Sequence, residues 1–156
     1  MKPYNRYNNS YSNKNRYQNN NYNRHDSEDE SDHIYTRAEV EKNLILHNII
    51  DFDYKKFEVY KAYVVFSDDP NSFKSRPIIV VRDNGDTVTC LKCTSKKYRT
   101  DNYWEKCPVE DWRYAGFTKP SYIILKEKLE INKRFIFKRM GKLKSEDIQN
   151  LQEIGL

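Results

Sequence analysis

The chain lacks the long apolar run that a membrane-spanning helix needs. No window of its 156 residues contains the roughly 18 consecutive apolar residues that can cross a bilayer. The N-terminus also lacks the apolar core of a secretory signal peptide. From these two absences we expect a cytoplasmic protein without a membrane partner.

Cysteine is scarce, and no histidine lies near the three cysteines. Cys90, Cys93 and Cys107 are an odd number without a secretion signal, which favours reduced thiols. A Cys-x-x-Cys pair with a third cysteine is typical of a zinc site. However, Cys90 and Cys93 fall on a predicted strand, where an offset of three turns side chains to opposite faces. We therefore expect buried thiols, with neither a metal nor a cofactor.

Aliphatic residues are missing from the first part of the chain. Residues 1–24 contain nine asparagines and five tyrosines but no aliphatic side chain after Met1, and an acidic run follows from Asp26 to Asp32. Such a segment cannot bury enough apolar area to offset its ordering entropy, so we predict a disordered tail over residues 1–33. Its tyrosines and arginines could stack on single-stranded RNA or promote self-association. We favour a solvated tail without a dedicated partner.

Net positive charge is absent from this tail and belongs to the rest of the chain. The tail holds five basic and five acidic residues, out of 28 Lys and Arg and 23 Asp and Glu in the whole chain. Residues 34–156 therefore hold 23 basic and 18 acidic residues and the entire net charge of +5. This balance favours polyanionic partners, although a charge of this size is also ordinary for solubility.

Residues 34–156 are predicted to form a single α+β domain. A capping-box pattern at Thr36 and Glu39 predicts a helix over residues 37–48, within a helical extension that spans residues 34–56. Several short strands and one closing helix, which begins near Ser145, predict a small barrel-like core over residues 57–156. The predicted strands are 57–66, 77–82, 87–93, 122–125 and 134–140.

The most informative segment combines a cation and hydroxyl groups around a hairpin. Ser75-Arg76-Pro77 enters an apolar strand, Asp83-Asn84-Gly85-Asp86 is a strong hairpin signal, and the return strand ends in Cys93-Thr94-Ser95. We expect such a hairpin to bring a fixed positive charge and hydroxyl donors to the same end. This combination suits a phosphodiester.

The order of motifs resembles the PemK/MazF family of toxin endoribonucleases over about residues 57–154. After the hairpin come Ala115-Gly116-Phe117, Lys119-Pro120-Ser121-Tyr122, Ile131-Asn132-Lys133 and Gly141-Lys142-Leu143. The resemblance implies an SH3-like barrel with a C-terminal helix, usually a homodimer, that cleaves single-stranded RNA without a metal. It also implies neutralisation by a cognate antitoxin protein. The active-site residues that it implies are Arg76 and Thr94, with Ser95 alongside.

The expected chemistry uses the ribose 2′-hydroxyl as an internal nucleophile. The protein must then stabilise a phosphorane of growing negative charge and move two protons. Arg76 is expected to offer its planar fork to phosphate oxygens, and Thr94 and Ser95 to add hydrogen bonds. An RNA-binding groove is predicted from cations and stacking rings. Its residues are Lys92, Lys96, Lys97, Arg99, Lys119 and Ser121, with Tyr98, Tyr103 and Trp104. For Lys96 and Lys97 a solvated loop is an equal alternative, and for Trp112 we favour a core role.

An acidic partner for proton transfer is missing from the expected place. The segment Tyr122–Lys126 has no carboxylate, although some family members carry an arginine and an aspartate there. Asp68 or Asp69 could act as a base, but a polar turn before Pro70 is the interpretation that we favour. An RNA-binding or regulatory module whose catalysis has decayed is therefore the alternative, and a toxin that grips a protein such as DNA gyrase is a third option.

Overall fold

The computed structural model describes residues 33–47, 53–65, 69–96 and 106–156. The chain divides into two units, Met1–His33 and Ile34–Leu156, and the second unit is described below. The predicted disorder of the tail concerns residues that, apart from His33, lie outside this description.

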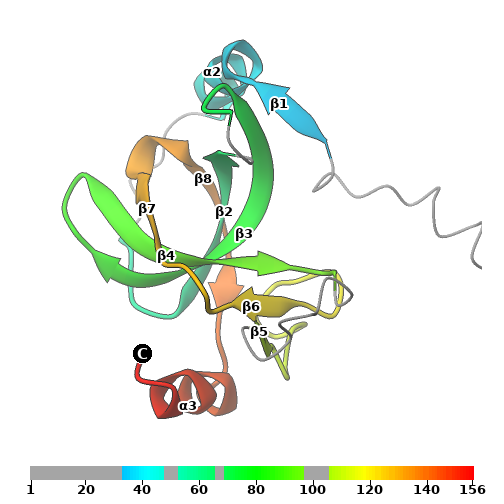
Figure 1. The fold of residues 1–156 in the computed structure, drawn as a ribbon, viewed down its shortest axis with the longest axis vertical. Helices are drawn as coiled ribbons and strands as arrows, with labels where there is room; N and C mark the ends of the chain where they lie inside the picture. The colour runs from blue at the N-terminus through cyan, green and yellow to red at the C-terminus, as the bar shows by residue number, and fades with distance from the viewer. Residues whose placement is uncertain (1–32, 48–52, 66–68, 97–105) are drawn as a thin grey trace, which may run out of the picture. The chain divides into compact units, whose positions relative to one another are not determined.

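The second unit is an α+β fold built on one antiparallel sheet (Figure 1). Six strands follow one another across the sheet in the order β5-β6-β4-β3-β2-β8, while β1 pairs with β3 and β7 pairs with β4. The strands are β1 (Ile34–Thr36), β2 (Glu58–Val65), β3 (Ser72–Asp83), β4 (Thr87–Thr94), β5 (Lys106–Pro108), β6 (Tyr122–Ile124), β7 (Leu129–Asn132) and β8 (Ile136–Lys142).

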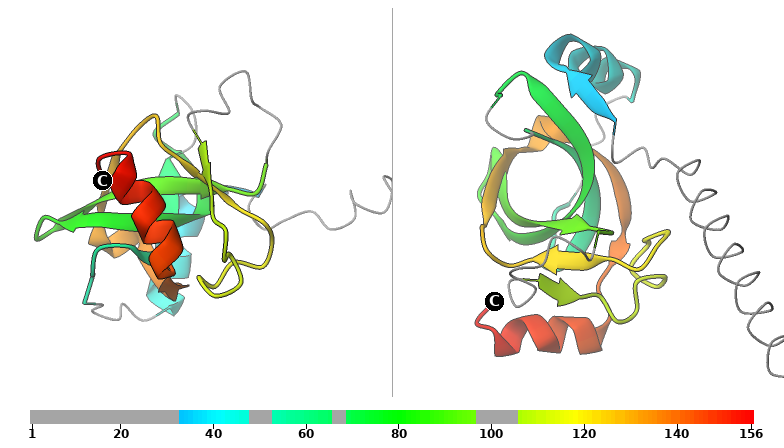
Figure 2. Two further views of the ribbon diagram at one scale, coloured as in Figure 1. Left: turned by 90° about the horizontal axis from the view of Figure 1, so that it is seen from below. Right: turned by 45° about the vertical axis from the view of Figure 1, so that its right-hand side comes forward.

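The two α-helices of the described residues begin at the predicted positions. Helix α2 (Arg37–Leu46) has Thr36 as its N-cap, and the capping box with Glu39 is present, which confirms the sequence prediction. Helix α3 (Ser145–Glu153) closes the chain. Figure 2 shows α2 and α3 at opposite ends of the sheet. Val40 and Leu44 of α2 pack against Tyr63 and Phe73, whereas Leu151 of α3 packs into a separate cluster.

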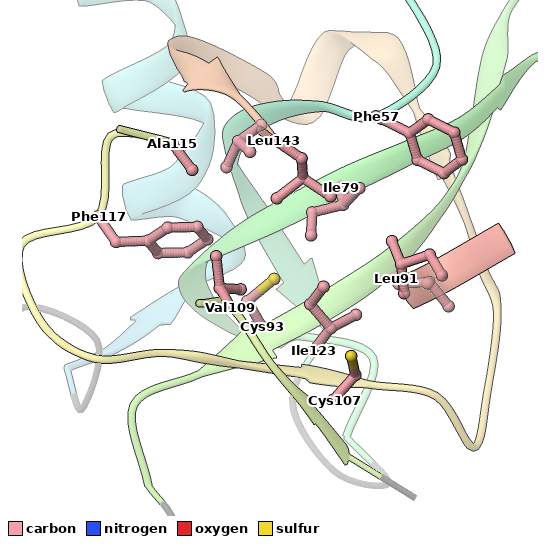
Figure 3. Close-up of a cluster of buried hydrophobic side chains, with 12 residues drawn as sticks. Phe57, Ile79, Leu91, Cys93, Cys107, Val109, Ala115, Phe117, Ile123 and Leu143 are labelled. Atoms are coloured by element: carbon pink, nitrogen blue, oxygen red, sulfur yellow. The ribbon is translucent and has the colours of Figure 1, made fainter. Parts of the chain in front are cut away.

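Both faces of the β2–β3–β4 sheet are covered, because alternate residues enter different cores. Ile78, Val80 and Cys90 belong to one core cluster, and we call this side of the sheet the Ile78 face. Ile79 and Leu91 point the other way, into a second cluster (Figure 3). A half-buried residue on the Ile78 face therefore marks the place where that core meets solvent.

The ends of the sheet meet without a strand ladder. Among the described residues, β5 and β8 end the strand order and share no pairing, so the predicted barrel is not closed by hydrogen-bonded strands. Instead, the turn after β5 packs directly on β8. A Cβ added at Gly116 would lie 2.3 Å from the carbonyl oxygen of Met140, and one at Gly141 would lie 2.6 Å from that of Ala115. Two glycines thus allow a close backbone contact between this turn and β8. Strand β5 itself has only three residues.

Candidate phosphate-binding site on β3 and β4

Arg76 and Thr94 lie on the same face of two neighbouring strands. Strands β3 and β4 pair through Ile78 and Lys92, and Arg76 and Thr94 are each two residues beyond that pair. Because side chains alternate along a strand, both lie on the Ile78 face. The pairing of Arg76 with Ala62 of β2, a member of the Ile78-face core, gives the same result independently.

Lys92 and Tyr122 complete this group. Lys92 is opposite Ile78, and Tyr122 of β6 is opposite Thr94. Arg76, Lys92, Thr94 and Tyr122, all half-buried, are called the Arg76 cluster below. The cluster combines two cations with two hydroxyl groups, and its four members include no carboxylate. Such a set is suited to bind and polarise a phosphate group.

The hydroxyl of Thr94 keeps its proton available. Its Oγ1 accepts a hydrogen bond from the backbone N–H of Lys96 at 3.1 Å, so the oxygen acts as an acceptor and the O–H remains a donor. Ser95 is half-buried and Lys96 is exposed. The carbonyl of Lys96 accepts a hydrogen bond from Lys106 Nζ at 3.3 Å. Lys97, Arg99, Tyr98, Tyr103 and Trp104 lie outside the described residues.

Among the described residues, the strand pairings on one edge of β3 are interrupted at Ser75–Pro77. On this edge β4 pairs with Ile78–Asp83 and β1 pairs with Ser72–Lys74, so within the described ranges Ser75, Arg76 and Pro77 have a strand neighbour only in β2. Strand β6 pairs with Cys93 and Thr94 on the other edge of β4, the one that faces away from β3. Pro77 has no N–H, which suits an unpaired edge.

Ser75 has a buried hydroxyl without a hydrogen-bond partner. The residue is 3% exposed, and its Oγ is the one buried side-chain polar atom that finds no partner in the described part of the chain. An unsatisfied buried hydroxyl costs about 1–3 kcal/mol. Sequence reasoning included this residue in the motif but gave it no role, because burial and partner count depend on the folded chain.

Lys119 and Ser121 take part in local packing. Ser121 is buried, and its Oγ donates to the carbonyl of Lys119 at 2.9 Å. Lys119 is half-buried. Trp112 packs against the core that contains Ile79, with the Arg113 guanidinium 4.5 Å from its ring centre, which confirms the core role favoured for this ring.

Asp69 is held in a turn. Its carboxylate accepts from the N–H of Asn71 at 2.9 Å and from the hydroxyl of Ser72 at 2.8 Å. These hydrogen bonds lower the pKa of Asp69 below its ordinary value, which makes it a weaker base. The polar-turn interpretation is thus confirmed for Asp69, whereas Asp68 lies outside the described residues.

A buried carboxylate that sequence reasoning missed lies farther along β2. Glu58 is 5% exposed; its Oε1 accepts from the Lys55 N–H and the Tyr60 hydroxyl, and its Oε2 pairs with Arg139. Burial and the bond to Glu58 raise the pKa of Tyr60. Along β2, Glu58 is four residues from Ala62, the partner of Arg76, or roughly 13 Å at the usual rise per residue. An acid inside the apolar segment Phe57–Phe66 was the available signal.

The cysteines are buried thiols on different faces. Cys90 belongs to the Ile78-face core, and Cys93 and Cys107 belong to the other, which confirms the expected opposite directions. Burial raises the pKa of Cys90 to about 12 and also raises the pKa of Cys93 and of Cys107. Across the described ranges, no group of three potential metal-ligating side chains occurs.

Comparisons with protein-family models and with curated proteins give no match. Neither of the two described helices has the length and apolar character that crossing a membrane requires.

Proposed function

We propose that this protein is a toxin-like, metal-independent endoribonuclease that cleaves single-stranded RNA, as the PemK/MazF resemblance implies. The observation that supports the proposal is the shared face and strand-end position of Arg76 and Thr94 on β3 and β4. Two residues that the resemblance names separately, 18 positions apart in the chain, thus belong to one cluster. The antiparallel sheet is compatible with an SH3-like barrel, which remains part of the proposal together with the homodimer and the antitoxin.

In the proposed reaction, the RNA supplies its own nucleophile. The 2′-oxygen attacks the adjacent phosphorus and loses its proton, and the bond from phosphorus to the 5′-oxygen breaks as that oxygen gains a proton. The products are a 2′,3′-cyclic phosphate and a 5′-hydroxyl. Arg76 and Lys92 face the equatorial phosphate oxygens, and Thr94 donates its O–H as negative charge grows.

The proposal is tested by incubating the purified protein with single-stranded RNA in EDTA and mapping the new ends. We expect 5′-hydroxyl ends, and about a hundredfold slower cleavage with Arg76→Ala, the effect typical of losing one preorganised donor. Thr94→Ala should slow cleavage roughly tenfold, with recovery in Thr94→Ser, because a hydrogen bond to a charged group is lost and then restored.

Arg82→Ala is the matched control on the same strand. Arg82 is exposed, and its Nε donates to Asn84 in the hairpin turn, away from the Arg76 cluster. Intact RNA at high enzyme concentration would refute the proposed activity. Equal cleavage by the Arg76→Ala and Arg82→Ala variants would refute the site.

A non-catalytic RNA-binding module is the second candidate, and one observation favours it. The Arg76 cluster contains no carboxylate, and the hydrogen bonds of Asp69 lower the pKa of that possible base. Binding of RNA that depends on Arg76 without any 5′-hydroxyl product would select this candidate.

A further inference from the structure

The end of the β4–β6 ladder places an aromatic residue beside Thr94. Tyr122, the first residue of β6, is opposite Thr94, the last residue of β4 (Figure 1). On its other side Tyr122 is opposite Pro108 of β5. The Cβ atoms of directly opposed residues in an antiparallel pair are about 4.5–5.5 Å apart. One ligand can therefore contact both the ring of Tyr122 and the hydroxyl of Thr94.

Tyr122 differs from the other half-buried aromatic residues of the described ranges in its packing. The others, Tyr35, Trp112, Phe135 and Phe137, all pack against a core cluster, whereas Tyr122 belongs to none of these clusters. Within the same ranges, its ring also has no contact with another ring or with a cation. A half-buried ring of this kind keeps an apolar surface that a flat ligand can cover.

Lys92 supplies a cation on the same face. It is two residues before Thr94 on β4 and lies about 7 Å away at the usual rise per residue. Among the described residues, no ion pair involves Lys92. A lysine ammonium is a point charge that suits a phosphate oxygen, and the hydroxyl of Thr94 remains a donor. Lys92 and Thr94 can thus hold one phosphate between them.

A phosphate with a ring beside it matches the two parts of a nucleotide. Each base of a nucleic acid strand is joined to its phosphate through a single sugar, so a phosphate at Lys92 and Thr94 leaves a neighbouring base close to Tyr122. Aromatic side chains hold the bases of single strands by stacking, and every base has a π-face. The arrangement therefore suits a nucleotide unit better than a phosphate alone.

We propose that Tyr122 stacks on the base next to the phosphate held by Lys92 and Thr94, and so determines affinity for single-stranded nucleic acid. The identity of the strand as RNA rests on the proposed function. The stacking contact itself can be measured without cleavage.

The first experiment compares the affinity of the full chain for two probes. One probe is a short single-stranded 2′-O-methyl RNA oligonucleotide, which has no 2′-hydroxyl to attack the phosphorus. The other is inorganic polyphosphate of the same charge, which has no bases. Tyr122→Leu removes the ring, and Tyr122→Phe keeps the ring but removes the hydroxyl. Tyr114→Leu is the matched control, because Tyr114 is 51% exposed and its ring faces Lys144 in the turn after β5.

We expect Tyr122→Leu to bind the oligonucleotide about tenfold more weakly, within the range typical of one stacked base, with polyphosphate binding retained. Tyr122→Phe and Tyr114→Leu should bind both probes like the parent. Lys92→Gln should weaken both probes, because a phosphate contact is lost. An equal loss of both probes in Tyr122→Leu would overturn the stacking, since it would show a general change of the site. Equal weakening by Tyr122→Phe would also overturn it, because the hydroxyl would then be the contact.

The second experiment measures cleavage of ordinary single-stranded RNA and separates the stacking from the proposed activity. Tyr122→Leu should raise KM about tenfold and lower kcat by less than about threefold, because stacking is equally strong in the ground and transition states. Cleavage with an unchanged KM would refute the stacking and leave the ribonuclease standing. Oligonucleotide binding that depends on Tyr122, without any 5′-hydroxyl product, would refute the ribonuclease and leave the stacking standing. A parent protein that binds neither the oligonucleotide nor RNA would refute both.

Discussion

At the scale of single residues, two serines near the site have opposite energetic roles. Ser75 and Ser121 are both almost fully buried. The hydroxyl of Ser121 donates to the carbonyl of Lys119, whereas that of Ser75 has no partner in the described part of the chain. A buried hydroxyl stabilises a protein only when its hydrogen bond replaces the one that it made with water.

We therefore predict that Ser75→Ala leaves the free energy of unfolding unchanged or raises it by about 1 kcal/mol, because an unsatisfied polar group is removed. Ser121→Ala should lower it by about 1 kcal/mol. Urea denaturation of the two variants and the parent measures both effects. A clear loss of stability in Ser75→Ala would mean that its hydroxyl has a partner.

At the same scale, sequence reasoning identified three residues of the Arg76 cluster as site residues but not the fourth, Tyr122. Arg76 and Thr94 were named from the motif order, and Lys92 from its charge. Tyr122 was assigned to a strand, but its position beside Thr94 depends on the β4–β6 pairing, which joins segments 28 residues apart. Glu58 was overlooked because its partner Arg139 is 81 residues away in sequence.

At the scale of elements, a single buried carboxylate connects α3 to the turn after β5. Asp147 is 2% exposed, and it accepts hydrogen bonds from the backbone N–H groups of Glu110 at 2.8 Å and Asp111 at 3.2 Å. The same turn carries Gly116 against β8. The helix thus holds the segment that completes the contact between the two ends of the sheet.

Asp147→Ala is predicted to lower the free energy of unfolding by about 2 kcal/mol, because two part-buried backbone N–H groups lose their charged acceptor. Glu146→Gln, in the same turn of α3 but exposed, should change it by less than about 0.5 kcal/mol. Thermal and urea unfolding compare the two variants. Similar stabilities would show that the helix is not the anchor of this turn.

The elements that sequence reasoning missed are short. Strands β1 and β5 have three residues and β7 has four, too few for an alternating pattern to stand out. Strand β3 begins at Ser72, five residues before the predicted strand. Its added length is paired with β1 and β2, so tertiary pairing extends a strand through a segment that is polar in sequence.

At the scale of the whole molecule, three carboxylates that accept hydrogen bonds are expected to contribute to the response to acid. Hydrogen bonds from Lys133 and Gly85 lower the pKa of Asp83, and those from Lys144 and Tyr114 lower the pKa of Asp111. The pKa of Asp69 is also lowered by its local hydrogen bonds. A folded-state pKa below the unfolded value near 3.8 contributes stability that is present above that value and is lost as the pH falls through the folded pKa.

Stability is therefore predicted to decrease below about pH 4, through the range in which these carboxylates become protonated. The triple variant Asp69→Asn, Asp83→Asn and Asp111→Asn should be less stable at pH 7 and show a shallower decrease between pH 4 and pH 2. The urea midpoint measured across this range checks both results. An unchanged slope in the triple variant would assign the acid sensitivity to other groups.

The sequence by itself determined the features that depend on neighbouring residues. Turn propensity predicts the Asp83–Asp86 hairpin. Hydrogen bonds between side chain and backbone three residues apart predict the Thr36–Glu39 capping box. Strand alternation predicts the opposite directions of Cys90 and Cys93. Only the tertiary structure decided that β1 and β4 pair with different parts of the same edge of β3, so that, among the described residues, Ser75–Pro77 have a strand neighbour in β2 alone. The reason is physical: strand partners distant in sequence are selected by the packing of both sheet faces, which no local pattern encodes.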